Sequence, residues 1–401
     1  MGNFSHFLQR LVHARTRPGT RIGLVLLLAA AFFLISAFNP NGSSSPKQVS
    51  AVTPSVILYV KAGGSGSGCS SWADACPDLQ AALSKAVGPA VEIWVAAGVY
   101  TPTPASDRLA SFSLKNHVAL YGGFAGGETA RSQRNWEAYP SILSGDIGVS
   151  GDARDNSFHV VTGSGIDASA VLDGFVITGG NASGTWPLSD GGGMRLEFHA
   201  QPRLANLKFI ANSAADYGGG LSVDNCSPTL VNVVFSRNRA VQGSGAVDNS
   251  GGMITFINVS FSGNSSQRGS GAISNFYGAF FTFHNSIAWG DSGHNGEVFN
   301  APGTNSNLSY SLVQGGCPAN SACDHLTSVD PRFTAPADDN LRLQPLSPAV
   351  DAGDNTFVPG GIAQDLSGGL RFSAVRAAAG SSAPVDLGAY ESKALFIPVV
   401  K

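Results

Sequence analysis

Residues 209–212 (FIAN), 235–238 (FSRN) and 261–264 (FSGN) are three copies of one pattern, Phe-x-x-Asn. Successive phenylalanines lie 26 residues apart, and a further asparagine precedes each by three residues, at Asn206, Asn232 and Asn258. A constant interval of this size indicates structural units that stack on one another. The pattern therefore predicts a repeat architecture in which each unit contacts mainly its two neighbours.

Alternate residues before each phenylalanine are apolar, which predicts strands with one buried face. These sets are Ala205-Leu207-Phe209, Val231-Val233-Phe235 and Ile257-Val259-Phe261. No helical pattern fits inside a unit, so short strands must form it, with equivalent strands stacked about 4.8 Å apart. We predict an all-β solenoid of coils in which Asn212, Asn238 and Asn264 mark a turn with left-handed backbone and a ladder of stacked amides.

An earlier copy of the repeat is residues 172–180, with Asp173 at the position of Asn206 and Val176 at the position of Phe209. The interval from Asp173 to Asn206 is 33 residues rather than 26, which indicates an insertion. We expect residues 181–190, which contain Trp186, to form the inserted loop.

Composition agrees with a turn-rich β-structure, because the 401 residues include 50 glycines and only 13% are charged. After residue 48, the one strong helical pattern is residues 78–87, with a proline before it and a glycine after it. Residues 1–48 hold five basic and no acidic residues, so the remainder holds 19 basic and 27 acidic residues. That balance argues against nucleic acid as a partner, since binding it requires clustered Lys and Arg.

Targeting information lies at the N-terminus. Four arginines precede residues 22–38, an uncharged apolar run of 17 residues that is at the lower limit for a membrane span. The basic flank orients the following chain out of the cytoplasm, with the N-terminal segment contacting the membrane. Two interpretations stay open: a cleaved signal peptide that gives a secreted protein, and an uncleaved membrane anchor.

Five cysteines fit an extracytoplasmic, oxidising compartment. Cys69 and Cys76 lie close together in sequence, as do Cys317 and Cys323, so two short-loop disulfides are expected and Cys226 is left over. A zinc site formed by Cys317, Cys323 and His325 is the competing interpretation, and it lacks a fourth ligand.

Gly218-Gly219-Gly220-Leu221, together with the Phe-x-x-Asn series, resembles the repeats of polymorphic outer-membrane proteins, which belong to the pectin-lyase-like superfamily. Residues 72–101 resemble the N-terminal cap of bacterial surface proteins with a choice-of-anchor Q domain, and residues 347–355 and 385–391 resemble their closing motifs. The resemblance implies a right-handed parallel β-helix with a short N-terminal capping helix and an irregular C-terminal cap. Only residues 392–401 follow the last motif, too short a stretch to cross a bilayer, so any anchor is expected at the N-terminus.

We therefore expect five segments. They are a basic flank with a signal peptide or membrane anchor (1–38), a flexible spacer (39–54), an N-terminal cap with the first coils (55–165), the repeat-bearing coils (166–316) and a C-terminal closing segment (317–401).

One constellation of side chains suits chemistry on a glycosidic bond. Residues 193–199 alternate so that Arg195, Glu197 and His199 share the outward face of one strand. Asp224 follows Glu197 by 27 residues and Asp248 follows Asp224 by 24, so stacking would place the carboxylates about 5 and 10 Å from Glu197. Such pairs serve as acid and base in glycosidases, and Trp186 could stack on a sugar. The alternative is that solvent-facing positions of a solenoid are polar without any catalytic role, and we favour it.

The function that we favour is a non-enzymatic surface or secreted protein for adhesion, binding an extracellular polysaccharide or another cell-surface macromolecule. The runner-up is a polysaccharide lyase or glycoside hydrolase that uses the outer face of the coils. The chain lacks the Asn-Thr-Asp, Gly-His-Gly, Arg-Ile-Lys and Arg-x-Pro-x-x-Arg motifs that enzymes of the superfamily use. No cofactor is expected. Asp146, Asp152 and Asp155 could bind calcium, but the sequence around them fits no ordered calcium-loop motif, and we favour a turn.

Overall fold

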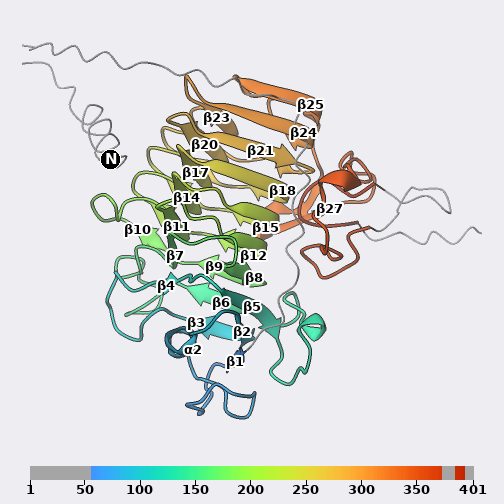
Figure 1. The fold of residues 1–401 in the computed structure, drawn as a ribbon. Coiled ribbons are helices and arrows are strands. Elements are labelled where there is room, and N and C mark those ends of the chain that lie inside the picture. Colours follow the sequence, from blue (N-terminus) through green and yellow to red (C-terminus); the bar gives the residue numbers. More distant parts are fainter. Residues whose placement is uncertain (1–55, 373–383, 393–401) are drawn as a thin grey trace, which may run out of the picture. The chain divides into compact units, whose positions relative to one another are not determined.

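Stacked parallel strands dominate the part of the chain that the computed structural model describes, residues 56–372 and 384–392 (Figure 1). The expectation of an all-β chain is confirmed for these residues. The basic flank, the apolar run and the spacer lie outside the described residues. Within the described ranges, no helix combines the length and apolarity needed to span a membrane.

Most of the described strands belong to three parallel sheets, which the chain visits in rotation between residues 171 and 276. The first sheet contains β1 (Val56–Val60), β2 (Val91–Ala96), β3 (Gly98–Tyr100), β5 (Val118–Phe124), β6 (Ser141–Ser144), β8 (Val171–Asp173), β9 (Phe175–Thr178), β12 (Arg203–Ile210), β15 (Thr229–Ser236), β18 (Met253–Ser262), β21 (Phe280–His284), β22 (Ile287–Ala288), β24 (Asn305–Val313) and β25 (Ser321–Thr327). The second sheet contains β4 (Phe112–Ser113), β7 (Val161–Ser164), β11 (Met194–Glu197), β14 (Leu221–Asp224), β17 (Val247–Ser250), β20 (Ile273–Phe276) and β23 (Val298–Asn300). The third sheet contains β10 (Asn181–Ala182), β13 (Ser213–Ala214), β16 (Arg239–Ala240) and β19 (Ser265–Ser266).

The 26-residue interval is the length of one coil. In the first sheet Phe209 pairs with Phe235, and Phe235 pairs with Phe261. Their buried rings stack with centroids 4.7 and 4.8 Å apart, so the repeated phenylalanines form a continuous column inside the core. Burying these rings adds to the apolar stabilisation that the buried aliphatic side chains of each coil also provide.

The predicted ladder of asparagine amides is present in the turn that follows these strands. Asn212 Nδ2 donates to Asn238 Oδ1 at 3.0 Å, and Asn238 Nδ2 donates to Asn264 Oδ1 at 2.9 Å. The last amide bonds to Asp291 instead of a fourth asparagine. We call Asn212, Asn238, Asn264 and Asp291 the turn column.

The left-handed backbone, however, does not fall on the turn-column asparagines as predicted. It falls one residue earlier, at Ala211, Arg237 and Gly263, whose φ angles are 55, 54 and 73°. The asparagine therefore keeps an ordinary backbone, and its side chain is free to bond along the stack.

A second column of asparagines has left-handed backbone within the first sheet. Asn206, Asn232, Asn258 and Asn285, which we call the bend column, have φ angles of 51, 56, 53 and 49°. Each interrupts the strand pairing, because Ala205 pairs with Val231 and Leu207 with Val233 while the asparagines between them do not pair. Asparagine tolerates this conformation better than most residues, which explains why it recurs where the strand changes direction.

The copy before the insertion differs in register from the prediction. Ile177, not Val176, pairs with Phe209, and Asp173 pairs with Ala205. Gly174, with a φ of 87°, therefore occupies the bend position that Asn206 has in the next coil. Asp173 resembles Asn206 in polarity, which explains the wrong prediction, but a glycine adopts the left-handed bend equally well.

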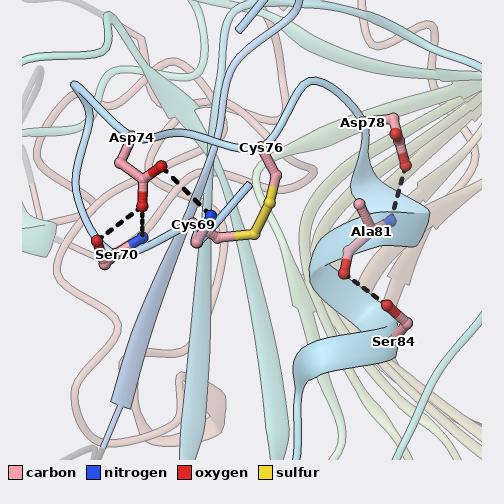
Figure 2. Close-up of a disulfide and its surroundings, with 8 residues drawn as sticks. Cys69, Ser70, Asp74, Cys76, Asp78, Ala81 and Ser84 are labelled. Atoms are coloured by element: carbon pink, nitrogen blue, oxygen red, sulfur yellow. Dashed lines mark hydrogen bonds between the residues drawn. A yellow bond between two sulfur atoms is a disulfide. The ribbon is translucent and has the colours of Figure 1, made fainter. Parts of the chain in front are cut away.

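The N-terminal end of the stack is closed by a helix, as expected, although the helix is shorter than predicted. It is α2 (Leu79–Lys85), which buries Leu79, Ala82 and Leu83. The Asp78 carboxylate caps it by accepting a hydrogen bond from Ala81 N at 2.7 Å (Figure 2). A disulfide between Cys69 and Cys76 holds the preceding loop.

The C-terminal segment lies beside the coils rather than across their end, which corrects the expectation of a terminal cap. Figure 1 shows β27 next to β15 and β18. The segment contains an antiparallel pair, β26 (Phe333–Ala335) and β27 (Asn340–Leu343), and two short 3-10 helices, Pro336–Asp338 and Asn355–Phe357. A third 3-10 helix, Arg131–Gln133, lies in the first coils. β25 continues the first sheet, so the coils extend past residue 316.

The bend column attaches this segment. Asn232 Nδ2 donates to Gln364 O at 2.8 Å, and Asn258 Nδ2 donates to Asp386 O at 3.2 Å. The Arg371 guanidinium is 0% exposed and donates to Asn232 Oδ1 at 2.6 Å. The closing motifs predicted from sequence therefore bind the flank of the first sheet.

Candidate functional site

The outer face of the second sheet carries the side chains that sequence analysis selected. Met194 and Leu196 of β11 and Leu221 and Val223 of β14 are fully buried, so the alternate residues of these strands point away from the core. Strand pairing aligns the outward residues into two rows along the stack. One row is Thr162, Arg195, Ser222, Asp248, Ser274 and Phe299, and the other is Ser164, Glu197, Asp224, Ser250 and Phe276.

Glu197 and Asp224 are neighbours on this face. Leu196 pairs with Val223, so the residues that follow them lie on adjacent strands, about 5 Å apart along the stack. Glu197 Oε2 accepts from Nη1 of Arg195, and Asp224 Oδ1 accepts from Asn225 Nδ2 at 2.8 Å. Both carboxylates are half-buried and already engaged in these contacts.

Asp248 does not join them. The spacing of 24 residues is two short of a full coil, so Asp248 pairs with Ser222, and Ser250 takes the position next to Asp224. Asp248 is 1% exposed, and a Cβ on Gly243 would lie 2.8 Å from its Oδ1 and 2.4 Å from Cδ1 of Tyr217. The chain covers this carboxylate, so the predicted row of three accessible carboxylates is reduced to two.

His199 also leaves the predicted row. β11 ends at Glu197, and Phe198 and His199 both adopt left-handed backbone, with φ angles of 56 and 61°. The alternation of outward residues therefore stops before His199, whose side chain is exposed. A different histidine lies closer to this face, since His159 is buried, with Nδ1 3.0 Å from Gly191 O. Burial first, and then the charge of Arg195, lower the pKa of His159 to about 4, so it is neutral at physiological pH.

Sequence analysis missed a group of aromatic side chains on the same face. The central ring is Phe276, and the ring centroids of Tyr217, Tyr277 and Phe299 lie 6.0, 6.2 and 5.8 Å from it. We call these four residues the aromatic cluster. Tyr277 is 38% exposed, and the other three rings are half-buried. The available signal was the 26-residue interval, which places Phe276 and Phe299 on the outward rows at positions where the preceding coil carries serine.

The inserted loop holds Trp186 at the surface, 50% exposed. Gly184 N bonds to Leu188 O, and Arg108 lies over the ring of Phe158 while donating to Ser183 Oγ. These contacts attach the start of the loop to the first coils beside β10. Within the described residues, no ring contact joins Trp186 to the aromatic cluster.

Both short-loop cysteine pairs form disulfides, Cys69 with Cys76 and Cys317 with Cys323. The alternative zinc site therefore loses two of its three proposed ligands. His325 instead stacks on Tyr310, with ring centroids 4.3 Å apart, and contacts Asp324. Cys226 is buried, and burial raises the pKa of its thiol to about 12, so it is an unreactive core residue.

The carboxylates considered for calcium make local contacts. Asp146 accepts from Gly151 N at 2.9 Å, Asp155 accepts from Val149 N at 2.8 Å, and Asp152 pairs with Arg154. These are turn contacts. In the described part of the chain, no three His, Cys, Asp or Glu side chains come together as metal ligands would.

No family model and no curated protein matches the chain. Among solved structures, the chain is similar to a crystal structure of pectate lyase Pel9A at 13% sequence identity. The similarity covers 86% of this chain and 98% of that one, with a TM-score of 0.37. A likeness of this degree leaves function to be argued from the residues of the chain itself.

Proposed function

We propose that the chain is an extracytoplasmic protein that binds a glycan on the outer face of the second sheet and does not cleave it. The observation that carries this proposal is the aromatic cluster, whose central residue Phe276 lies on the same row of the sheet as Glu197 and Asp224. Aromatic rings provide flat apolar surfaces for the CH groups of a sugar, and carboxylates accept hydrogen bonds from its hydroxyls. At the strand spacing of about 4.8 Å, Phe276 lies about 10 Å from Asp224 along the stack, so an extended chain could contact both.

Cleavage is less well supported than binding. A glycosidase needs two carboxyl groups that can exchange protons with substrate and water. Asp248 is covered, and the carboxylate of Glu197 is neutralised by Arg195. Of the three predicted carboxylates, only Asp224 is both accessible and outside the ion pairs of the described residues, and one carboxylate does not make an acid and base pair.

We also propose that the coils wind as a right-handed parallel β-helix of the kind seen in choice-of-anchor Q surface proteins. Support comes from the parallel crossover between β12 and β15, because such connections are right-handed in about 98% of cases. An experimental structure with a left-handed winding would remove this assignment.

Location outside the cytoplasm is supported by the two disulfides and by the basic flank before residues 22–38. N-terminal sequencing of the exported protein distinguishes the two proposed states. A new N-terminus near residue 39 indicates a cleaved signal peptide, and retention of the apolar run indicates an anchor. Recovery of the reduced protein from the cytoplasm would contradict both.

The binding proposal is tested with the full chain against a panel of soluble neutral, acidic and amino-containing polysaccharides. We expect retention by at least one polymer in affinity electrophoresis, with no new reducing ends and no unsaturated products. Asp224→Asn should weaken retention about three- to tenfold, and Asp338→Asn, on the C-terminal segment, is the matched control. If the wild-type chain released oligosaccharides and Asp224→Asn abolished that release, the binding proposal would be replaced by the lyase or hydrolase hypothesis.

A further inference from the structure

A pocket of about 710 Å³ lies where the C-terminal segment meets the turns of the first sheet. One wall comes from successive turns, which contribute Arg237, Gly263 and Trp289, and the other comes from Asp330, Arg332 and Gln344 of the segment. Beside the pocket the segment is attached to the coils by Asp339, which accepts from Ser236 Oγ and from Nε of Arg237 at 2.7 Å each. The pocket is separate from the outer face of the second sheet, and none of its lining residues belongs to the aromatic cluster.

The pocket combines a fixed aromatic ring with fixed polar groups. Trp289 is half-buried and packs against the apolar cluster that contains Ile287 and Leu312. Arg237 is held by Asp339, with its Nε donating to Oδ1 at 2.7 Å and a second bond to Oδ2. Gln344 is held by donation from Nε2 to Phe333 O at 3.0 Å. Side chains that are ordered before a ligand arrives lose less entropy when it binds.

Arg332 and Asp330 are the polar lining residues that can still make hydrogen bonds to a ligand. Asp330 Oδ1 accepts from Arg332 N at 2.7 Å, which places the two side chains at the same turn. Nη1 of Arg332 makes only a long contact of 3.4 Å to Leu346 O, and no carboxylate among the described residues pairs with this guanidinium. Both residues are exposed and line the pocket from the same turn, so it offers a guanidinium donor and a carboxylate acceptor.

We propose that this pocket binds a single pyranose residue with vicinal hydroxyl groups. The indole of Trp289 would pack on the sugar ring, while Arg332 donates to one hydroxyl and Asp330 accepts from its neighbour. The two charges of Arg332 and Asp330 balance, so the pocket favours a neutral sugar over an anion or a cation. The ligand class rests on the proposed glycan-binding function, and the site itself is a different one.

The test uses the full chain and the methyl glycosides of glucose, galactose and mannose, with the corresponding ring-opened hexitols as comparison ligands. Binding is followed by ligand-observed NMR and by titration calorimetry. We expect at least one glycoside to bind in the millimolar range and its hexitol to bind at least tenfold more weakly, because an open chain has no flat face for the indole. Arg332→Gln and Trp289→Phe should each weaken glycoside binding about five- to tenfold.

Arg268→Gln is the matched control, since Arg268 is exposed and lies outside the pocket. Arg332 is also exposed, so its substitution leaves the core intact and keeps the test valid if Trp289→Phe destabilises the chain. The inference is overturned if no glycoside binds, if hexitols bind equally well, or if Arg332→Gln binds like wild type. Loss of glycoside binding in Phe276→Ala with no effect of Arg332→Gln would assign the sugar to the aromatic cluster and leave the proposed function standing.

Discussion

The turn column and the bend column repeat at nearly the same interval, yet their amides bond to different partners. In the turn column each asparagine bonds to the next one and to a carbonyl of the preceding coil, as Asn238 does to Phe209 O at 2.9 Å. In the bend column Asn232, Asn258 and Asn285 donate to carbonyls of the C-terminal segment. Bonds along the stack are present only at the start of this column, from Asn232 to Asn206 and from Asn206 to Asp173, among the described residues. A repeated polar residue inside a turn is satisfied within the stack, whereas one at an outward bend can attach another part of the chain.

Breaking the turn column should have the largest effect. Asn238→Ala removes the partners of Phe209 O, of Asn212 N and of two side-chain amides, all in the buried interior. Buried donors and acceptors that lose their hydrogen-bond partners destabilise the folded state, so we expect the free energy of unfolding to fall by about 3 to 5 kcal/mol. Urea denaturation followed by circular dichroism measures this loss. Asn307→Ala, at an exposed strand position with ordinary backbone, is the control and should change the free energy of unfolding by less than about 0.5 kcal/mol.

Breaking the bend column should have a smaller and local effect. Asn232→Gly keeps a residue that tolerates the left-handed backbone of this position. It removes one acceptor of the buried Arg371 guanidinium and the donor to Gln364 O and to Asn206 Oδ1, at a cost of about 2 kcal/mol. We expect faster hydrogen exchange at residues 384–392, while β12, β15 and β18 keep their protection. If Asn232→Gly and Asn238→Ala accelerated exchange over the same residues, the distinction between the two columns would be wrong.

The end of the turn column predicts a pH dependence. Burial raises the pKa of Asp291 well above its ordinary value of 3.8, with the charge of Glu297 adding to the effect, and burial also raises the pKa of Glu297 above 4.5. Both carboxyls therefore bind protons more tightly in the folded state. Their contribution to stability is complete below the unfolded pKa values and is lost as pH rises through the folded ones.

Asp291→Asn removes one titrating group while keeping a side chain that can accept from Asn264. We expect thermal unfolding temperatures to fall less steeply between pH 5 and 9 than in wild type, with equal or higher stability at the alkaline end. His159 and His284, whose pKa values burial lowers to about 4, act oppositely and destabilise the chain as pH falls below about 6.5. They are common to both proteins and cancel in the comparison. A steeper decline in the variant would contradict the assignment.

The sequence predicted the stack because its period, its buried phenylalanines and its amide ladder are local and repeated. The predicted register of Asp248 is wrong, because Asp248 follows Asp224 by 24 residues while one coil spans 26, so Ser250 and not Asp248 pairs with Asp224. The attachment of the C-terminal segment could not be read from sequence, since Asn232 and Arg371 are 139 residues apart and share no pattern. The aromatic cluster was overlooked for a similar reason, because Tyr217 and Phe276 meet across two coils.

The central claim is that the asparagine columns build the scaffold, while unrepeated side chains on the second sheet bind ligand. It is tested most directly by measuring the affinity of Phe276→Ala for the polysaccharide that retains the wild-type chain. The account predicts at least a tenfold loss of affinity, with a thermal unfolding temperature close to that of wild type because the ring is only half-buried. Unchanged affinity in a folded Phe276→Ala protein would contradict it.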